Sequence, residues 1–353
     1  MKTVFVGMSG GVDSSVAAAL LKKQGYKVVG VYMKNWTKDL PGMPCPWLED
    51  FQDAKRVAVQ LGIDFQVYDF EKQYFDKVVK YMLEGFKAGF TPNPDIMCNQ
   101  EIKFKLFLDT ALENGADMIA TGHYAKTKGG HLLMAKDQNK DQTYFLHRVP
   151  AKAFAKSIFP LGGLTKPQVR EVAKKFGLAT AEKKESMGIC FVGKVGIKDF
   201  LKQYIKEKPG KIIDQNGKVV GRHEGAFFYT IGQRHGLDVG GGLPYYVNGK
   251  DIKKNEVYVT SDIQDKNLWS KQIHLTSMHL ITQFPSFRGP SLERELKIRL
   301  RHRAKLVGVK SVEKGQRFWK IELAEEAKAV TPGQSAVFYA GNECLGGGIV
   351  SHP

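Results

Sequence analysis

The sequence is poor in cysteine, and this limits the chemistry that it can support. Four cysteines occur among its 353 residues, namely Cys45, Cys98, Cys190 and Cys344. They lie far apart and none belongs to a C-x-x-C pair, so neither a zinc ribbon nor a cysteine-ligated iron–sulfur cluster is expected. In a reducing compartment the four side chains should remain thiols unless the protein's own chemistry oxidises them.

Long apolar stretches are also missing. The sequence contains no run of about 18 apolar residues, which is the minimum for a transmembrane helix. The N-terminus leads directly into a predicted strand and lacks the apolar core of a signal peptide. No basic amphipathic helix with an apolar face stands out either. We therefore expect a cytoplasmic protein that has no membrane partner.

Acidic residues are outnumbered by basic ones. The 53 Lys and Arg residues against 36 Asp and Glu residues give a formal net charge of +17. This excess favours a polyanionic partner, and nucleic acid suits it better than a membrane surface does. The apolar content of 42% is typical of a globular protein, and the length predicts two or three domains rather than one core.

The stretch SGGVDSS at residues 9–15 is predicted to bind an anion. It follows an apolar, β-branched run at residues 4–8 and precedes an Ala/Leu-rich run at residues 16–21, which predict a buried strand and a helix. Gly10 and Gly11 can adopt positive φ and let the backbone approach a phosphate. The N–H groups and dipole of the helix start, with the serine hydroxyls of the loop, would bind the phosphate. An ordinary turn whose aspartate caps the helix is the alternative.

This loop lacks the lysine that a Walker A motif requires. It instead resembles the PP-loop of the ATP pyrophosphatase superfamily, whose members cleave ATP between the α and β phosphates and adenylate a substrate. Asp13 by itself would repel a phosphate, whereas a bound Mg²⁺ ion would make its carboxylate favourable. We therefore expect ATP with Mg²⁺, with Asp13 as the candidate contact of the metal, and no metal site built by the protein alone.

Strands alternate with helices in the first part of the chain. Predicted strands at residues 27–33 and 65–69 flank a predicted helix at residues 49–61, which indicates a doubly wound parallel sheet with ligands at the carboxyl ends of its strands. Met33 ends one strand and could lie near a nucleotide base, although an ordinary core methionine fits equally well. Gly122 follows another predicted strand and would permit close approach of a nucleotide. We assign residues 1–203 to this catalytic domain.

The pattern of apolar and turn-forming residues changes after residue 203. Asn-Gly pairs between short apolar runs predict hairpins, and hence a small β-rich middle domain at residues 204–273. Residues 274–353 are predicted to form a C-terminal antiparallel β-barrel. In its run LKIRLRHR, an extended strand would place Arg299, Arg301 and Arg303 on one face, where a phosphate backbone would compensate their charge. A solvated strand face is the alternative.

Two cysteines fall in segments with notable neighbours. Residues 89–99 contain two prolines within three positions and are predicted as a stiff loop that ends at Cys98, before a predicted helix at residues 101–113. A helix start favours a thiolate, and the nearby Asp95 could act as an acid or base. Cys190 lies in a loop of small residues, and a buried, inert thiol is the alternative for it.

Several motifs in this order together resemble those of the tRNA-specific 2-thiouridylases of the bacterial type. The resemblance covers nearly the whole chain. The motifs are SGGVDSS, MKNW at residues 33–36, TPNPDIMCNQEIKF at 91–104, ATGHYA at 120–125, KDQTYFL at 140–146, GICFVG at 188–193, TIGQRHGL at 230–237, and TPGQSAVFY and CLGGGIV near the end. Each is weak alone, and their combination is specific. The Pro-rich residues 40–47 depart from the family pattern, so Cys45 receives no role.

The resemblance implies positions for the substrates. ATP would bind at Gly7, Met8, Ser9, Gly10, Gly11, Val12, Asp13 and Ser14, with Met33 and Gly122 completing the site. The target base would meet Asn93, Pro94 and Asp95. The tRNA would contact Lys140, Asp141 and Gln142, together with Arg299, Arg301, His302 and Arg303.

The resemblance also implies a reaction on the wobble uridine of a tRNA anticodon stem-loop. Adenylation of the C2 oxygen would make AMP the leaving group, because that oxygen alone leaves poorly. Cys190 would carry a persulfide sulfur from a donor protein or cysteine desulfurase, and Cys98 would complete sulfur release by forming a disulfide with it. Asp95 would be the general acid/base. A monomer is expected.

Other functions remain open at this point. A small-molecule PP-loop synthetase or amidotransferase would need neither the two loop cysteines nor a basic barrel. A non-catalytic RNA-binding protein that uses ATP structurally would tolerate loss of both cysteines. A thiocytidine enzyme of the iron–sulfur kind would want a C-x-x-C pair, and a 4-thiouridine enzyme an RNA-binding domain before the PP-loop.

Overall fold

The structure is a computed structural model that describes residues 1–39, 45–184, 196–237, 239–240, 244–283 and 295–352. The first part of the chain forms a five-stranded sheet in which every neighbouring pair of strands is parallel. The strand order is β3 (Asp64–Asp69), β2 (Lys27–Lys34), β1 (Thr3–Gly7), β4 (Met118–Ala120) and β7 (Ser157–Ile158). β1 is thus central, and the loop that follows it opens at the carboxyl edge, where ligands bind in such sheets.

Helices cover both faces of this sheet, which confirms the doubly wound fold. Val4 and Val6 of β1 pack with α1 (Val12–Lys23), α2 (Trp47–Leu61) and α9 (Lys166–Lys175) on one face. Phe5 points to the other face because side chains alternate along a strand. That face is covered by a hairpin of two long helical arms. The first arm consists of α3 (Glu71–Tyr74), the π-helix η1 (Phe75–Val79) and α4 (Lys80–Lys87). The second arm consists of α5 (Pro94–Met97), the π-helix η2 (Cys98–Phe107) and α6 (Leu108–Glu113).

The second arm of this hairpin begins earlier than the sequence predicted. Residues 94–99 were expected to be loop because of the two prolines, but Pro94 is the first residue of α5. Proline fits the first helical position, where its missing N–H would have no partner in any case. The Asn93 side chain caps the helix, since its Oδ1 accepts from the N–H groups of Asp95 (3.1 Å) and Ile96 (3.4 Å). Cys98 therefore lies in a helix.

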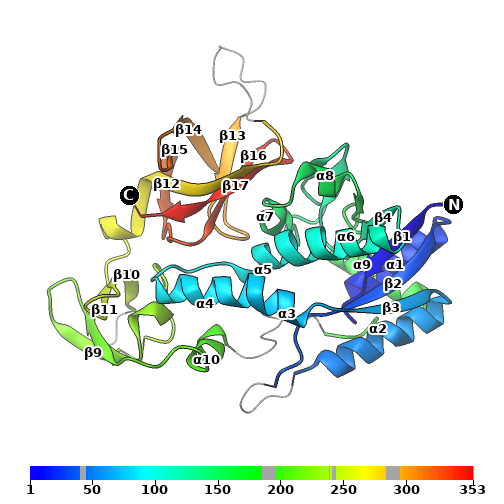
Figure 1. Cartoon of the computed structure of the whole chain (residues 1–353). Helices are drawn as coiled ribbons and strands as arrows, with labels where there is room; N and C mark the ends of the chain where they lie inside the picture. The colour runs from blue at the N-terminus through cyan, green and yellow to red at the C-terminus, as the bar shows by residue number, and fades with distance from the viewer. Residues whose placement is uncertain (40–44, 185–195, 238, 241–243, 284–294, 353) are drawn as a thin grey trace.

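The chain then builds two β-rich bodies at the other end of the molecule (Figure 1). The middle one is a four-stranded sheet of β10 (Tyr246–Asp251), β11 (Glu256–Thr260), β8 (Gly210–Ile213) and β9 (Val219–His223), with a small core around Ile212, Val247 and Val257. Its flanking helices are α10 (Ile197–Lys202), η3 (Ala226–Phe228) and η4 (Lys266–Leu268).

The last body is the predicted antiparallel barrel. Its strands follow the order β12 (Trp269–Leu280), β15 (Trp319–Lys328), β14 (Val307–Lys314), β13 (Leu296–Arg299), β16 (Ser335–Ala340) and β17 (Glu343–Ser351), and pairing of β12 with β17 closes it. β12 runs across the expected domain limit between residues 273 and 274. The domain limits otherwise remain predictions.

A hairpin of the catalytic domain joins the barrel, which the sequence did not reveal. β5 (Lys126–Lys128) and β6 (His131–Leu133) follow β4, and β6 pairs with β17 through Leu132 and Cys344. Two short helices follow it, α7 (Thr143–Leu146) and α8 (Ala151–Phe154). The signal was Gly129-Gly130, both at positive φ as a tight hairpin turn requires. Catalytic domain and barrel therefore share one continuous sheet.

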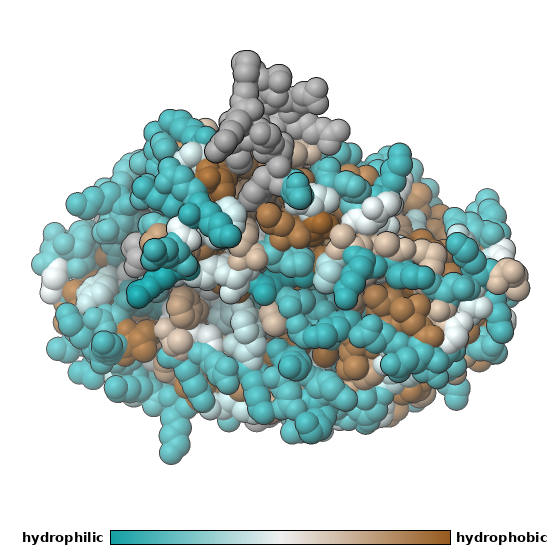
Figure 2. Space-filling model, turned by 45° about the horizontal axis from the view of Figure 1, so that its top comes forward, coloured by the Kyte–Doolittle hydropathy of each residue, from teal (hydrophilic) through white to brown (hydrophobic). Residues whose placement is uncertain are grey.

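The surface agrees with a polar, basic protein. In the view of Figure 2 hydrophilic residues cover most of the face, and hydrophobic residues form several separate patches. Among the residues that the structure describes, none of the helices combines the length and apolarity needed to cross a bilayer.

Buried neutral histidines predict a pH dependence of stability. Burial lowers the pKa of His147 to about 3 and that of His123 well below its usual value. In the unfolded chain these histidines have pKa values near 6.5 and bind protons that the folded state does not bind. Their contribution to the free energy of unfolding is therefore complete above pH 6.5 and is lost as the pH falls toward 3. Between pH 7.5 and 5.5 we expect urea denaturation to show a loss of about 1.4 kcal/mol per such histidine.

A matched pair of variants isolates this effect. His147→Gln should flatten part of the pH dependence, whereas the same change at the exposed His235 should leave it unaltered. An unfolding free energy that stays constant between pH 7.5 and 5.5 would contradict the assignment.

Candidate active site

The loop between β1 and α1 has the backbone form of an anion site. Gly10 has φ of +72°, and a Cβ there would lie 2.2 Å from the backbone oxygen of Asp50 in α2, so only glycine fits. Gly11 has φ of −95°, and the expectation of positive φ at this second glycine is wrong. Gly11 is the N-cap of α1 and provides no side chain to cap it, which leaves the start of the helix suited to an anionic ligand.

The serine hydroxyls of the loop mainly hold its shape. Ser14 and Ser15 donate to the backbone oxygen of Gly11 at 3.1 and 2.9 Å, and Ser15 is fully buried. The Ser14 oxygen accepts from the N–H of Ser9 at 3.1 Å. The exposed Ser9 is the serine best placed to meet a ligand directly.

Asp13 has a partner that the sequence analysis missed. Both of its carboxylate oxygens accept from Lys166 Nζ, at 2.7 and 2.8 Å, and the Tyr124 hydroxyl donates to Oδ1 at 2.9 Å. Lys166 is the first residue of α9 and is buried. An ammonium group thus compensates the charge that the sequence analysis assigned to Mg²⁺, and contact of a metal with Asp13 remains a prediction. Within the described ranges no group of three or more His, Cys, Asp or Glu side chains could hold a metal ion.

Met33 and Gly122 converge on the same loop. A Cβ at Gly7 would lie 2.9 Å from Met33 Cε, so the methionine packs beside the end of β1. A Cβ at Gly122 would lie 2.7 Å from the Ser14 nitrogen. Glycine at 122 is therefore needed for the first turn of α1 to pack against the end of β4. Nucleotide contacts of residues 7–14, Met33 and Gly122 remain predictions.

A pocket lies on the same side of the sheet, after the ends of β2 and β3. Its volume is about 670 Å³. It combines cationic, anionic and aromatic side chains, from Trp36, Lys38, Glu71, Lys72, Phe75, Asp76 and Lys80. Lys72 and Lys80 both pair with Asp76, at 2.9 and 2.6 Å, and the Trp36 ring is buried against Phe75, so these groups have partners within the protein.

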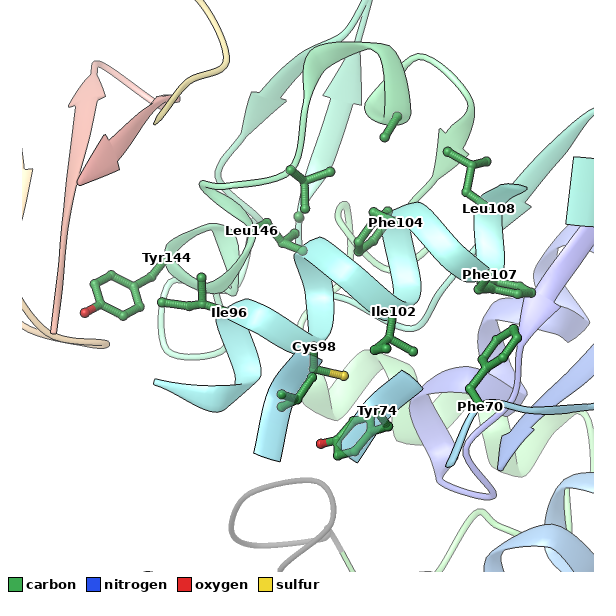
Figure 3. Close-up of a cluster of buried hydrophobic side chains, with 14 of the residues drawn as sticks. Phe70, Tyr74, Ile96, Cys98, Ile102, Phe104, Phe107, Leu108, Tyr144 and Leu146 are labelled. Carbon is green, nitrogen blue, oxygen red and sulfur yellow. The ribbon is translucent and has the colours of Figure 1, made fainter. Parts of the chain in front are cut away.

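The Cys98 thiol is enclosed by the helical hairpin. It is 1% exposed and belongs to the buried cluster that includes Tyr74, Ile96 and Ile102 (Figure 3). The expectation that Cys98 ends a loop is wrong, because the residue lies one turn inside the helix that Pro94 begins. The reactivity of its thiol remains a prediction. Asp95, half-buried in that first turn, and the capping Asn93 stand at the helix start.

Cys190 lies outside the described residues, but the chain leading to it is anchored. Lys183 Nζ binds Asp50 Oδ1 at 2.7 Å and Asp53 Oδ2 at 2.6 Å, both on α2. Arg170 donates to the backbone oxygen of Lys183 at 3.2 Å. The segment before Cys190 is thereby fastened to the helix whose Asp50 also packs on Gly10.

The expected RNA-contacting triplet 140–142 has mostly internal partners. Asp141 is 1% exposed, and it accepts from the Ala135 N–H at 2.8 Å and the Thr143 hydroxyl at 2.5 Å. Gln142 Oε1 accepts from the Tyr124 N–H at 2.9 Å. The prediction of direct RNA contact is therefore wrong for Asp141 in this structure. Lys140 is partly exposed, and contacts of Lys140 and Gln142 with RNA remain predictions.

The arginines of 299–303 do not share a strand face. β13 ends at Arg299, whose guanidinium is buried 3.5 Å from Asp141 Oδ1 and 5.1 Å from the Tyr339 ring. Arg301 Nη2 donates to the backbone oxygens of Ile231 at 2.7 Å and Ala329 at 3.0 Å. Both cations thus have internal partners, and the three-arginine surface was wrong because the strand stops after the first.

The other two residues of this turn differ in exposure. The His302 ring lies 4.5 Å from that of Phe145, and burial lowers its pKa to about 4, so it is neutral at pH 7. Arg303 is exposed at φ of +63°. Of these four residues Arg303 is the one left free on the surface to meet a phosphate, and that contact remains a prediction.

A pair of substitutions separates the two roles. Arg301→Met should lower the free energy of unfolding by about 1–3 kcal/mol, because it leaves carbonyl oxygens between the middle domain and barrel without donors. Arg303→Met should leave stability unchanged and weaken RNA binding. Thermal unfolding and a filter-binding titration check both. A stable Arg301→Met protein with weakened RNA binding would restore the original prediction.

Three family models cover the chain in succession, described as tRNA methyl transferase HUP domain (residues 2–194), tRNA methyl transferase PRC-barrel domain (198–261) and aminomethyltransferase beta-barrel domain (270–350).

Individual relatives match over almost the full length. A protein of Bacillus subtilis named tRNA-specific 2-thiouridylase MnmA is 48% identical over 352 residues, covering 98% of this chain and 94% of its own. One of the same name from Levilactobacillus brevis is 48% identical over 357 residues, with the same coverage. Among solved structures, a 4-thiouridine synthetase–RNA complex with bound ATP matches 57% of this chain and 50% of its own at 17% identity and a TM-score of 0.35, too distant to carry an argument.

Proposed function

The chain belongs to the tRNA-specific 2-thiouridylase family, and we propose that it replaces the C2 oxygen of a tRNA uridine with sulfur in an ATP-dependent reaction. The observation that carries the proposal is the full-length likeness to proteins named for this activity, which spans all three bodies of the fold. The backbone conformation at Gly10 and the Cys98 thiol would supply chemical groups that such a reaction needs. The +17 net charge suits a tRNA substrate.

The uncapped start of α1 and the Gly10 backbone would receive the phosphates of ATP, with the metal ion arriving on the nucleotide. ATP supplies the adenylyl group that turns the C2 oxygen into a leaving group, with loss of pyrophosphate. Lys166 lies close enough to Asp13 to neutralise it, and a phosphate approaching this loop would then meet a balanced pair rather than a bare anion.

Sulfur transfer would use the two predicted cysteines. The terminal sulfur of a Cys190 persulfide attacks C2 and AMP leaves, or Cys98 first displaces that sulfur as hydrosulfide, which then attacks. In either route the Cys98 thiolate forms a bond to Cys190 Sγ, the persulfide S–S bond breaks, and a disulfide remains that a two-electron thiol reductant must reduce. Asp95 is proposed as the acid or base, and Asn93 and Pro94 would meet the extruded wobble uridine.

The enclosed position of Cys98 adds a requirement to this scheme. A thiol that is 1% exposed within an apolar cluster meets a base or a sulfur donor from solvent only when the groups that cover it shift. We propose that binding of tRNA, ATP or both brings about that shift. We propose that the enzyme acts as a monomer in the cytoplasm and receives its sulfur from a sulfur-donor protein or a cysteine desulfurase.

The decisive experiment is direct. The protein is incubated with unmodified tRNA, Mg-ATP and sulfide, the RNA is digested, and nucleosides are analysed by mass spectrometry. We expect 2-thiouridine and pyrophosphate from the wild type. With free sulfide, Cys190→Ala should retain part of the activity, because sulfide replaces the persulfide. Pyrophosphate release with another acceptor and no thiolated nucleoside would indicate a small-molecule synthetase instead.

A further inference from the structure

One short segment bonds to three parts of the molecule. Residues 135–142, here called the bridge segment, connect the hairpin β5–β6 to α7. Asp137 Oδ2 accepts from the backbone N–H of Lys166 at 2.9 Å, at the start of α9. Asp141 lies 3.5 Å from the guanidinium of Arg299 in the barrel. Gln142 bonds to Tyr124, so the bridge segment reaches α9, the barrel and the end of β4 together.

Tyr124 extends this connection to the PP-loop. Its backbone oxygen accepts from the Gln142 N–H and its own N–H donates to Gln142 Oε1, both at 2.9 Å. Its hydroxyl, at the other end of a side chain that is 2% exposed, donates to Asp13 Oδ1 at 2.9 Å. A single buried residue therefore spans the distance between the bridge segment and the PP-loop carboxylate.

The connection is closed on a second side by Lys166. Its backbone binds Asp137 of the bridge segment, and its ammonium binds both oxygens of Asp13. Asp13 is thus linked to the bridge segment through two residues, Tyr124 and Lys166. Buried polar groups with several partners are held in fixed relative positions, so a displacement at one end is passed on rather than absorbed.

The barrel end of the connection faces the basic turn after β13. Arg299 precedes the exposed Arg303 and Lys305 by a few residues. Arg299 is the last residue of β13 and leads into this turn, and its partner Asp141 is adjacent to Gln142. RNA on the barrel and a nucleotide on the PP-loop would then act on opposite ends of one set of bonded, buried residues.

We propose that Tyr124 is a positioning residue that couples RNA binding on the barrel to nucleotide binding at the PP-loop. The inference rests on the proposed function, since it takes tRNA and ATP as the two ligands. It adds that each ligand tightens the binding of the other, by a factor that thermodynamics requires to be the same in both directions. A nucleotide would then be held and used chiefly when RNA is in place.

The coupling is measurable as a ratio of dissociation constants. Calorimetric titration gives the Kd of a non-hydrolysable ATP analogue with and without saturating tRNA, and the Kd of tRNA with and without the analogue. For the wild type we expect a ratio of about 5-fold or more in both directions. In Tyr124→Phe, which removes the hydroxyl alone, the ratio should fall to within about 2-fold of unity while both ligands still bind.

Matched variants show whether the route matters rather than a lost hydroxyl. Tyr32→Phe removes another buried tyrosine hydroxyl of the same sheet, bonded to the Trp47 oxygen at 3.0 Å and outside the route, and should keep the wild-type ratio. Gln142→Ala removes the side-chain acceptor of the Tyr124 N–H at the other end of the route. It should lower the coupling ratio toward unity, even if it also weakens tRNA binding by itself.

The outcomes separate the two proposals. Wild-type coupling retained in Tyr124→Phe, or no coupling in the wild type while both ligands bind, would overturn the role of Tyr124 and leave the proposed function standing. A wild type that binds neither tRNA nor the ATP analogue would overturn the proposed function, and the coupling with it.

Discussion

Replacing Cys98 by alanine is expected to lower the rate of 2-thiouridine formation by about 1,000-fold or more, as loss of a reacting nucleophile does in other enzymes. The helical hairpin has no other described thiol that could take over. The assay must supply sulfur as a persulfide on Cys190, because free sulfide attacks C2 directly and leaves no persulfide bond for Cys98 to cleave. Mass spectrometry of digested tRNA, at several turnover times, gives the rate.

The matched control is Cys344→Ala. Cys344 is as buried as Cys98, but it lies in the barrel strand β17, where burial holds the pKa of its thiol far above the usual value. Each substitution should cost about 1 kcal/mol of stability, because it removes one buried atom of moderate size. Thiolation should survive at Cys344→Ala. Thiolation that also survived at Cys98→Ala would remove Cys98 from the mechanism.

Burial of Cys98 has its own measurable consequence. In the free protein, alkylation of Cys98 by iodoacetamide should be slow, and tRNA with an ATP analogue should accelerate it as the hairpin opens. Peptide mapping after timed labelling separates Cys98 from the half-buried Cys45. Fast labelling of the free protein would mean that the enclosed arrangement is not the resting state in solution.

Replacing Lys166 by methionine is expected to lower the rate of pyrophosphate release by about 100-fold, which corresponds to about 2.7 kcal/mol of transition-state destabilisation. Methionine keeps most of the side-chain volume and removes the ammonium group, which is 10% exposed and bonds both oxygens of Asp13. Asp13 would then face the phosphates of ATP as an uncompensated anion.

The controls separate charge from folding. Lys174→Met lies on the same helix, but its surface ion pair with Glu182 contributes little, so it should change neither rate nor stability. Adding Asp13→Asn to Lys166→Met removes the uncompensated charge and should restore nucleotide affinity in part. Wild-type rates in Lys166→Met would show that the pair serves the fold alone. Equilibrium unfolding of each variant shows whether any loss of rate comes from loss of structure.

Much of the fold could be predicted because its signals are local. The strand, the loop with Gly10 and helix α1 occupy adjacent residues, and each obeys a short-range preference for burial, positive φ or helix formation. The barrel and the middle sheet followed from alternation and from turn residues. The motifs indicated the chemistry for the same reason, since the residues of each motif are neighbours in the chain.

The errors came where the outcome depended on distant partners. LKIRLRHR alternates as a strand would, yet β13 ends at Arg299, because Arg301 finds its acceptors at Ile231 and Ala329. Proline was expected to break residues 94–99, but the Asn93 cap turned Pro94 into a helix start. The buried setting of Cys98 depends on side chains of the other hairpin arm.

The amino-acid sequence by itself determined the three-part architecture, the phosphate-binding form of the PP-loop and the two cysteines on which the proposed chemistry depends, because these follow from local conformation and from residue type. Only the tertiary structure decided that Lys166 neutralises Asp13 from 153 residues away, that Tyr124 and the bridge segment tie the PP-loop to the barrel, and that Asp141 and Arg299 face each other instead of RNA. The physical reason is that a buried charge or hydroxyl takes whichever partner folding brings within about 3 Å, and spacing along the chain holds no record of that choice.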